Sequence, residues 1–372
     1  MPQALQDFLA GTKLTELFQS EAIKSGTPRK LPAEAFIPSP NKPRTDKVEW
    51  LEVRGNRQAA RVVARSSPSK ARELPGVTRR YATALNFKES MTIDPELQDA
   101  LVSDNPIVAK NAALKFNLDM RNFRSFFDNS RTNAVASVFV QGCIYVDAEG
   151  NMVPTSTGAV QKVGPGIADS ETLVPTTDGS KYVIGDFSVA TTNIGASLRA
   201  YRDAQRRKNG YEADTILYGQ NMPDHLVKNT VHKEYFARHP ELRAKLVSEN
   251  EIPNGVLGFN WKPVHEMFQE SAGATLDADP VVTTWFDPNF IGIMPTIENS
   301  WYEFFEGGNN VPKGIAGPTA SMQEMLSMFD VVNGLYSFAE MTVNPNGLSV
   351  HMGDSHLPVF KVPGVYAAGK CA

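Results

Sequence analysis

The most regular pattern of apolar and polar positions in this sequence lies within residues 105–130. Apolar side chains recur there at intervals of three or four residues, which places them on one face of an α-helix. These positions are Val108, Ala112, Phe116, Met120, Phe123 and Phe127. Asp104 is a candidate N-cap and Pro106 suits the first turn. We expect a helix about 39 Å long, at 1.5 Å per residue, whose aromatic stripe packs in a core and forms no cofactor site.

Alternating positions and turn residues predict strands in the rest of the chain. The strongest strand pattern covers residues 134–146 and is followed by the turn sequence DAEGN and a return strand in MVPTS. Near the C-terminus, strands at 337–343 and 347–352 flank the turn sequence NPNG. Further strands are expected at 211–219, 255–261, 281–294 and 357–362, and one helix at 221–247.

The first forty residues have the pattern of an arm. Short helical spacing of apolar residues occurs within 1–25. Residues 25–44 then hold five prolines, a density that prevents regular helix and favours extended chain. A second irregular stretch, 155–180, is rich in Thr, Ser, Gly and Pro and is expected to be a long loop.

Residues 47–88 are predicted to form a long two-armed ribbon. In the returning arm Tyr81, Thr83, Leu85 and Phe87 alternate with polar or small residues, and a turn-rich tip precedes it at 66–76. An arm of about 20 residues would span roughly 60 Å, whereas a compact globule of this chain length has a radius of gyration of only about 21 Å. A lone hairpin is marginally stable in water. The ribbon is therefore expected to rest on another surface.

Charge along the chain indicates what that surface is. Residues 42–88 contain twelve Lys/Arg and four Asp/Glu, a net charge of +8, whereas 89–372 carry −12. Such asymmetry favours an acidic protein partner for the ribbon. Nucleic acid ranks second, because only Trp50 and Tyr81 could stack on bases. The candidate inter-subunit contact residues are Arg54, Arg57, Arg61, Arg65, Arg72, Arg79 and Arg80.

Composition places the chain among ordinary folded proteins. Its 372 residues are 41% hydrophobic and 21% charged. No apolar run approaches the ~18 residues of a membrane span, and the N-terminus lacks the pattern of a secretion signal. We expect a protein made and used in a cytoplasm. Of its two cysteines, Cys143 is expected to be a buried core thiol and Cys371 an incidental terminal one.

Searches for catalytic, metal and cofactor sites give no candidate residues. His225, His232 and His239 lie seven residues apart on the expected helix, too far apart for one metal ion, and are interpreted as surface residues. The sequence His265–Glu266 begins like a zinc motif but lacks the second histidine. No phosphate-binding glycine loop or nucleophile elbow is present. The absence of these motifs makes an enzyme a less favoured interpretation but does not exclude one, because active sites can assemble from distant residues.

Four segments together resemble a known family. They are DNPIVAKNAALKFNLDMRNFRSFF continuing into SVFVQGCIYVDAEGNMVP, then ADTILYGQNMPDHLVKN, VVTTWFDPNFIGIMP and FAEMTVNPNGLSVHM. With the arm and the ribbon, their order resembles the major capsid protein of tailed bacteriophages, in particular the lambda-type head protein (major capsid protein E family) with its Hong Kong 97-like fold.

The resemblance implies an α+β capsid fold and its division of the chain. The expected parts are an N-terminal arm (1–41), an extended hairpin loop (42–92), a peripheral domain with a spine helix (93–190), an axial domain (191–330) and C-terminal strands returning to the two domains (331–372).

The resemblance also implies a non-enzymatic shell protein in the virion, assembled in the host cytoplasm. It would form pentamers and hexamers around double-stranded DNA, contacted non-specifically. Scaffold, portal and decoration proteins are candidate partners, and no cofactor, metal or membrane is expected. An encapsulin-like nanocompartment shell is the nearest alternative, and a cytoplasmic enzyme with an unrecognised site is a more distant one.

Overall fold

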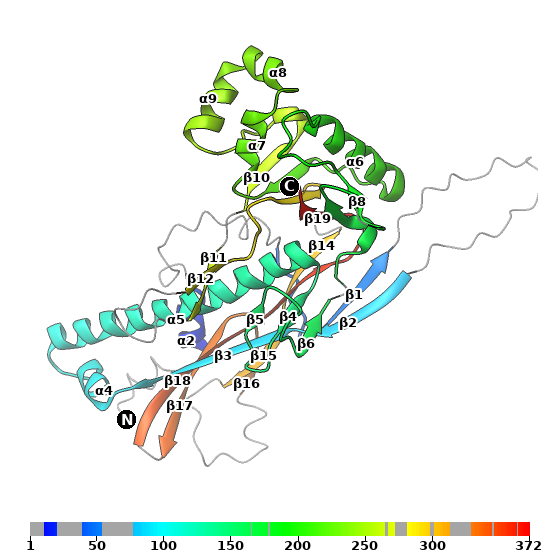
Figure 1. The fold of residues 1–372 in the computed structure, drawn as a ribbon. Helices are drawn as coiled ribbons and strands as arrows, with labels where there is room; N and C mark the ends of the chain where they lie inside the picture. The colour runs from blue at the N-terminus through cyan, green and yellow to red at the C-terminus, as the bar shows by residue number, and fades with distance from the viewer. Residues whose placement is uncertain are drawn as a thin grey trace, which may run out of the picture.

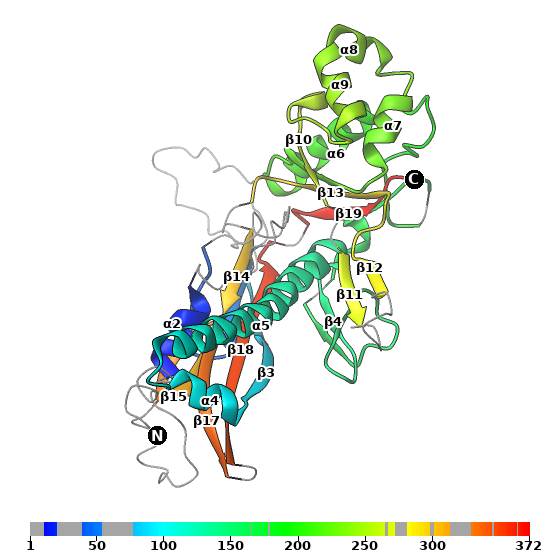
Figure 2. The same ribbon diagram turned by 90° about the vertical axis from the view of Figure 1, so that its left-hand side faces the viewer.

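The structure is a computed structural model, drawn in two views in Figures 1 and 2. One half of the elongated molecule holds a long helix on a long sheet, and the other holds a second sheet with shorter helices (Figure 2). The residues that the structure describes are 11–20, 39–53, 77–164, 166–177, 179–264, 267–271, 281–297, 301–312, 329–343, 346–362 and 364–372.

The long helix α5 (Pro106–Gln141) is the longest element of the described chain. Its N-cap is Asn105, whose side chain accepts a hydrogen bond from the Ile107 amide at 3.0 Å, so Asp104 is not the cap. Its C-cap is Gly142, in the left-handed conformation at φ 73°. At 1.5 Å per residue the helix is about 54 Å long.

The helix continues eleven residues past its predicted end, and the strand prediction for 134–146 is wrong over 134–141. Residues 134–139 are buried without interruption, so the segment shows neither helical nor strand periodicity. Only its last part forms a strand, β4 (Ile144–Val146), which pairs with β5 (Met152–Val153) as the predicted return strand.

The long sheet lies beneath α5. Its central strand is β18, which pairs with β17 and then β14 along one edge and with β3 along the other. The strands are β3 (Leu85–Ile93), β14 (Tyr302–Glu306), β17 (Tyr336–Val343) and β18 (Asn346–Phe360). The predicted C-terminal strand pair is confirmed, although the expected strand at 357–362 is a continuation of β18 and not a separate element.

The core of this half confirms most of the predicted stripe. Phe116, Met120 and Phe127 of α5 are fully buried against the sheet, and Phe18 of α2 (Gly11–Gln19) packs beside them. Val108, in the first turn of α5, is instead 40% exposed. The remainder of the expected 1–25 helix lies outside the described residues.

The second half is built on a six-stranded sheet of order β10-β9-β13-β19-β7-β8. Its strands are β7 (Thr172–Val174), β8 (Tyr182–Val183), β9 (Thr215–Tyr218), β10 (Asn260–Pro263), β13 (Phe290–Met294) and β19 (Ala367–Lys370). β9 confirms the strand predicted at 211–219. The strand predicted at 281–294 is interrupted, with β12 (Val281–Thr284) paired separately to β11 (Met267–Ser271).

Four helices cover this sheet, and the prediction of one helix over 221–247 is wrong. The helices are α6 (Ile194–Asn209), α7 (Met222–Lys228), α8 (Lys233–Arg238) and α9 (Pro240–Ser248). Asn229 is extended and ends α7, while Pro240, which has no backbone N–H, begins α9.

Several short elements complete the described chain. The predicted strand at 255–261 is mostly a 3-10 turn (Val256–Gly258) preceding β10. The predicted loop at 155–180 contains β6 (Gln161–Val163), β7 and a 3-10 turn (Asp169–Glu171). The remaining strands are β1 (Lys47–Val53), β2 (Val77–Thr83), β15 (Gly308–Pro312) and β16 (Phe329–Asn333). The remaining helix is α4 (Pro95–Leu101).

Candidate functional site

The base of the predicted ribbon is present as an antiparallel strand pair. β1 and β2 pair in register from Lys47 opposite Thr83 to Val53 opposite Val77. The returning arm changes partner at Ala84, whose amide donates to the Asp46 carbonyl at 2.8 Å, and then enters the long sheet as β3. The ribbon therefore begins at residue 84, and the predicted arm residues Leu85 and Phe87 belong to the body.

One face of the ribbon base is packed onto the body. Val48 and Trp50 are buried, at 0% and 8% exposure, in a cluster with Ala134 and Val138 of α5 and Ile144 of β4. Alternation along a strand directs every second side chain to this face. The packing fixes the direction in which the ribbon departs, which is away from α4 (Figure 1).

The opposite face of the ribbon base carries apolar and charged side chains together. Tyr81 is 82% exposed and Leu51 is 51% exposed, which is unusual for large apolar residues so close to a core. Beside them Arg79 and Glu49 form an exposed ion pair with Nε and Oε1 2.5 Å apart. This mixture of a large aromatic residue, an aliphatic residue and an arginine is typical of protein interfaces.

The structure describes two of the seven predicted contact arginines. Arg79 and Arg80 are both exposed and lie on opposite faces of β2. Arg54, Arg57, Arg61, Arg65 and Arg72 lie outside the described residues. Their contacts with another subunit remain a prediction.

A cavity of about 590 Å³ lies beneath the ribbon base. It is bordered by Trp50 and Arg80 of the ribbon, by the loop that follows β6, and by Glu171. Glu171 is 2% exposed and accepts hydrogen bonds from Tyr201 at 2.9 Å and from Gln205. Lys208 also pairs with Glu171, so the buried carboxylate has its partners within the chain.

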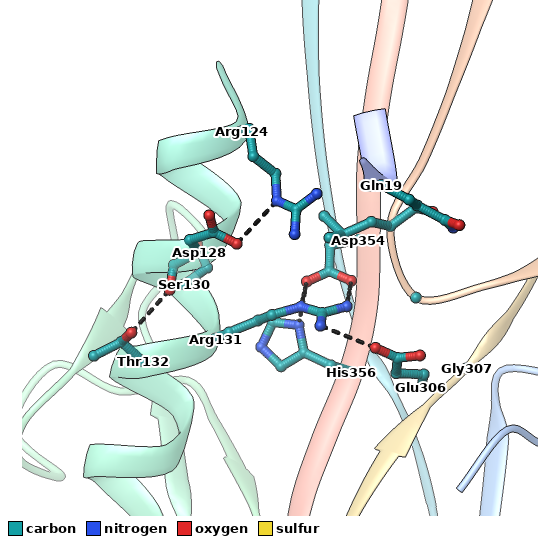
Figure 3. A network of polar contacts seen from close by, with 12 residues as sticks. Gln19, Arg124, Asp128, Ser130, Arg131, Thr132, Glu306, Gly307, Asp354 and His356 are labelled. Carbon is teal, nitrogen blue, oxygen red and sulfur yellow. Dashed lines mark hydrogen bonds and ion pairs between the residues drawn. The ribbon is translucent and has the colours of Figure 1, made fainter. Parts of the chain in front are cut away.

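A buried polar cluster joins α5 to the long sheet (Figure 3). Arg131 of α5 donates from Nε and Nη2 to the two carboxylate oxygens of Asp354 in β18, at 2.6 and 2.7 Å. A third nitrogen of Arg131, Nη1, lies 2.9 Å from Oε1 of Glu306 in β14. His356 places Nδ1 2.8 Å from Asp354 Oδ2. One arginine thus connects three elements, and sequence patterns do not reveal this because its partners are 175 or more residues away.

The rings around His356 hold the cluster in place. The imidazole is fully buried and stacked between Phe87 at 5.0 Å and Phe304 at 5.7 Å. Burial alone would favour the neutral acid of Asp354, but the charges of Arg131 and His356 outweigh it and hold its pKa well below the ordinary value. The cluster is a set of buried ion pairs that joins α5 to β14 and β18.

The three histidines are arranged differently from the prediction. The three histidines do not share a helix: His225 lies in α7, His232 precedes α8 and His239 precedes α9. His232 is only 7% exposed and its Nε2 accepts the Gly195 amide at 3.2 Å, so it is not a surface residue. Burial, and then nearby Arg199, lowers its pKa.

Both cysteines are buried, as predicted for Cys143 but not for Cys371. Cys371 is fully buried in the core of the second half because β19 carries the end of the chain into the sheet. This burial raises its pKa to about 12, which suppresses the reactive thiolate.

Within the described residues, no group of three or more His, Cys, Asp or Glu side chains is placed to hold a metal ion. No helix among them is long and apolar enough to cross a membrane. His265 and Glu266 of the partial zinc motif lie outside the described residues.

Comparison with known proteins identifies the fold. Neither a protein family model nor a curated protein sequence matches this chain. A solved structure does: the protein described as the capsid protein of a prophage of E. coli CFT073 superposes with a TM-score of 0.57 and 12% identity, over 98% of this chain and 99% of that one. This chain has a Hong Kong 97-like capsid fold.

Two further structures match over nearly their whole length. A phage-related protein of Bordetella bronchiseptica RB50 is 10% identical, with a TM-score of 0.44 and 98% of each chain covered. The capsid of a native GTA particle is 12% identical, with a TM-score of 0.44 and coverage of 95% and 94%. The predicted α+β class and the predicted capsid fold are confirmed by the first superposition.

Proposed function

We propose that this chain is the major capsid protein of a tailed bacteriophage, which assembles with copies of itself into an icosahedral shell around double-stranded DNA. The observation that carries the proposal is the superposition on a prophage capsid protein along 98% of the chain. A fold can serve many functions, so a second observation matters. The exposed Tyr81 and Leu51 at the ribbon base are features of a subunit that is covered in an assembly.

The proposal divides the chain by its role in the shell. Residues 1–41 are an arm and 42–92 an extended loop. Residues 93–190 form a peripheral domain with α5 as its spine, 191–330 an axial domain, and 331–372 the strands that return to both. The sheet topology supports the last part of this division, because β18 lies in the long sheet whereas β19 lies in the six-stranded sheet.

Assembly in this proposal uses the ribbon to bind a second copy. The seven arginines meet acidic side chains of that copy, and Tyr81 and Leu51 are buried. Each exposed ion pair contributes only about 0.2–1 kcal/mol, so a shell contact needs many pairs together with apolar burial. The protein has no catalytic role here; it resides in the virion and is assembled in the host cytoplasm. Scaffold, portal and decoration proteins, and DNA bound non-specifically, are its further partners.

The test is the size and shape of the purified full-length protein. We expect closed particles by negative-stain microscopy and a sedimentation coefficient far above that of a 40.8 kDa monomer. The variant Arg54→Glu/Arg57→Glu/Arg61→Glu/Arg65→Glu should lose particles, while the matched Arg→Lys variant at the same four positions should retain them.

Two results would contradict these statements separately. A protein that remains a small oligomer at every salt and protein concentration contradicts the shell function. Normal particle yield from the four-glutamate variant contradicts only the electrostatic part. Particles that enclose a cargo enzyme and exclude DNA in the native host would identify the nanocompartment alternative.

A further inference from the structure

The side of α6 that faces away from the core carries an excess of positive charge. The helix contains five Lys/Arg and one acid, Asp203, a net charge of +4, whereas the whole chain carries −4. Its buried side, which includes Leu198 and Tyr201, packs in the core of the second half. Four arginines lie away from that core, and we call them the arginine stripe: Arg199, Arg202, Arg206 and Arg207.

Contacts within the fold do not explain the arginine stripe. None of its four members forms an ion pair in the described chain, although Asp203 lies on the same side of α6. Cations in the last turn of a helix interact favourably with its dipole, which accounts for Arg206 and Arg207. Arg199 and Arg202 follow the first residue of α6 by five and eight positions and lie outside the last turn, so the dipole does not account for them.

Two contacts determine where guanidinium groups of the stripe lie. The guanidinium carbon of Arg202 is 5.0 Å from the ring centre of Phe259, in a cation–π contact. Arg199 folds back over the first turn of α6, where its Nη1 would be 3.2 Å from a Cβ added to Gly195. The stripe thus extends along most of the helix, and Arg199 to Arg206 alone covers about 10.5 Å of helix rise. This length matches about three phosphates of one DNA strand, at about 3.4 Å of duplex axis each.

The surroundings of the stripe favour a phosphate backbone over a protein surface as its partner. Protein interfaces centre on buried apolar and aromatic side chains, yet α6, which is described throughout, exposes no large apolar residue. The exposed residues between the arginines are Ala196, Ala200 and Asp203. The ribbon base differs, because Tyr81 and Leu51 accompany its charges. A surface of arginines alone suits phosphate, which the planar guanidinium binds through paired donors.

The neighbouring side chains also favour double-stranded over single-stranded nucleic acid. Single-strand sites stack bases on exposed aromatic rings, but Tyr201 is buried and its neighbour Tyr182 packs edge-on against it at 4.8 Å. Gln205, whose amide could read a base edge, is buried and donates to Glu171. The described surface of α6 therefore offers contacts to phosphates and none to bases.

We propose that the arginine stripe on α6 binds the phosphate backbone of double-stranded DNA without regard to sequence. The inference rests on the proposed function, in which the shell encloses DNA, and it names the residues that contact the DNA. A chain with a net charge of −4 is repelled by DNA as a whole, so the contact depends on this local excess of charge. Its affinity falls as salt rises, because binding releases the cations condensed on the duplex.

The test is the salt dependence of DNA binding by the full-length protein. Dissociated subunits are titrated into a fluorescent duplex of about 30 base pairs between about 50 and 200 mM salt, and binding is followed by anisotropy. The stripe variant is Arg199→Gln/Arg206→Gln/Arg207→Gln. It should reduce the slope of log affinity against log salt by about 2.7, at about 0.9 for each lost phosphate contact, and weaken binding about tenfold or more. Duplexes rich in A·T and in G·C should bind alike.

The control Lys233→Gln/Arg238→Gln/Arg243→Gln removes the same charge from exposed cations of α8 and α9 and should leave the slope unchanged. Circular dichroism checks that each variant is folded. An unchanged slope in the stripe variant, or an equal fall in the control, would overturn the inference. Loss of particles by the stripe variant with an unchanged DNA slope would also overturn it, because the stripe would then bind an acidic surface of a second copy.

These outcomes are separable from those of the proposed function, because sedimentation and microscopy measure particle formation independently. If wild-type particles form but the stripe variant keeps the full slope, the inference fails and the shell function stands. If the stripe variant loses the slope while the wild type never forms particles, DNA binding by α6 stands and the shell function fails.

Discussion

At the scale of single residues, Arg131 is the clearest case of a side chain whose role depends on the whole fold. Its guanidinium is bound to Asp354 by two hydrogen bonds and to Glu306 by an ion pair, and all three residues are largely or fully buried. Removing one member of a buried ion pair leaves an uncompensated charge, which is much more costly than losing an exposed pair.

Asp354→Asn should therefore lower the free energy of unfolding of the unassembled subunit by about 3–5 kcal/mol. Chemical denaturation monitored by tryptophan fluorescence measures this change. The control Glu149→Gln alters an exposed carboxylate and should have almost no effect. Equal stability of Asp354→Asn and wild type would show that the ion pairs of Arg131 do not stabilise the packing of α5 on the long sheet.

The same carboxylate predicts a pH dependence. The pKa of Asp354 is lower in the folded than in the unfolded protein, so its stabilising contribution is present above the unfolded value of about 3.9 and is lost as the pH falls below it. Wild type should thus lose stability more steeply than Asp354→Asn as the pH falls from about 4 toward 2. Parallel curves for the two proteins would contradict the assignment.

At the scale of elements, the end of α5 is determined by Gly142. Its φ of 73° is unfavourable for other residues, and an added Cβ would lie 2.5 Å from backbone atoms of Gly166 and Ile167. The helix end is thus packed directly against the loop that borders the cavity beneath the ribbon.

Gly142→Ala should cost more than the roughly 1–3 kcal/mol of a left-handed residue alone, because the loop must also move. Gly150→Ala is the matched control: its φ is 90°, but its Cβ would meet nothing within 4 Å. Thermal unfolding of the two variants gives the comparison. If Gly142→Ala is no less stable than Gly150→Ala, the contact with the loop is unimportant.

The sequence predicted a helix or strand correctly where one face of that element is buried and the opposite face is exposed. Phe116, Met120 and Phe127 indicated α5 correctly because only one side of that part of the helix is buried. The prediction failed at residues 134–141, where burial on all sides removes the periodicity. The exposure of Ile107, Leu114 and Leu118 on α5 was not predicted for a related reason, since the sequence pattern does not show which apolar residues remain uncovered.

At the scale of the whole molecule, long-range pairing decides the architecture. β19, which no sequence pattern predicted, lies between β13 and β7 in the centre of the six-stranded sheet. The base of the basic ribbon was predicted from charge and alternation, whereas the position of β19 was not, because pairing between strands far apart in the sequence leaves no local pattern.

Removal of residues 367–372 should therefore prevent folding of the second half, because β7 and β8 would lose their only strand pairing with the rest of the sheet in the described chain. We expect insoluble protein on expression. Lys370→Gln, which keeps the strand and removes only the partly exposed ion pair with Asp287, should stay soluble. A soluble truncated protein with unchanged circular dichroism would show that β19 is dispensable.

The position of β19 also has a consequence for biosynthesis. β8 ends at Val183 and β19 ends at Lys370, so the ribosome adds about 190 residues before the two flanking halves of the sheet can join. At 5–20 residues per second this takes roughly 10–40 s. During that interval the nascent polypeptide presents unsatisfied strand edges, and chaperones that recognise such edges would have their longest opportunity to act on this protein.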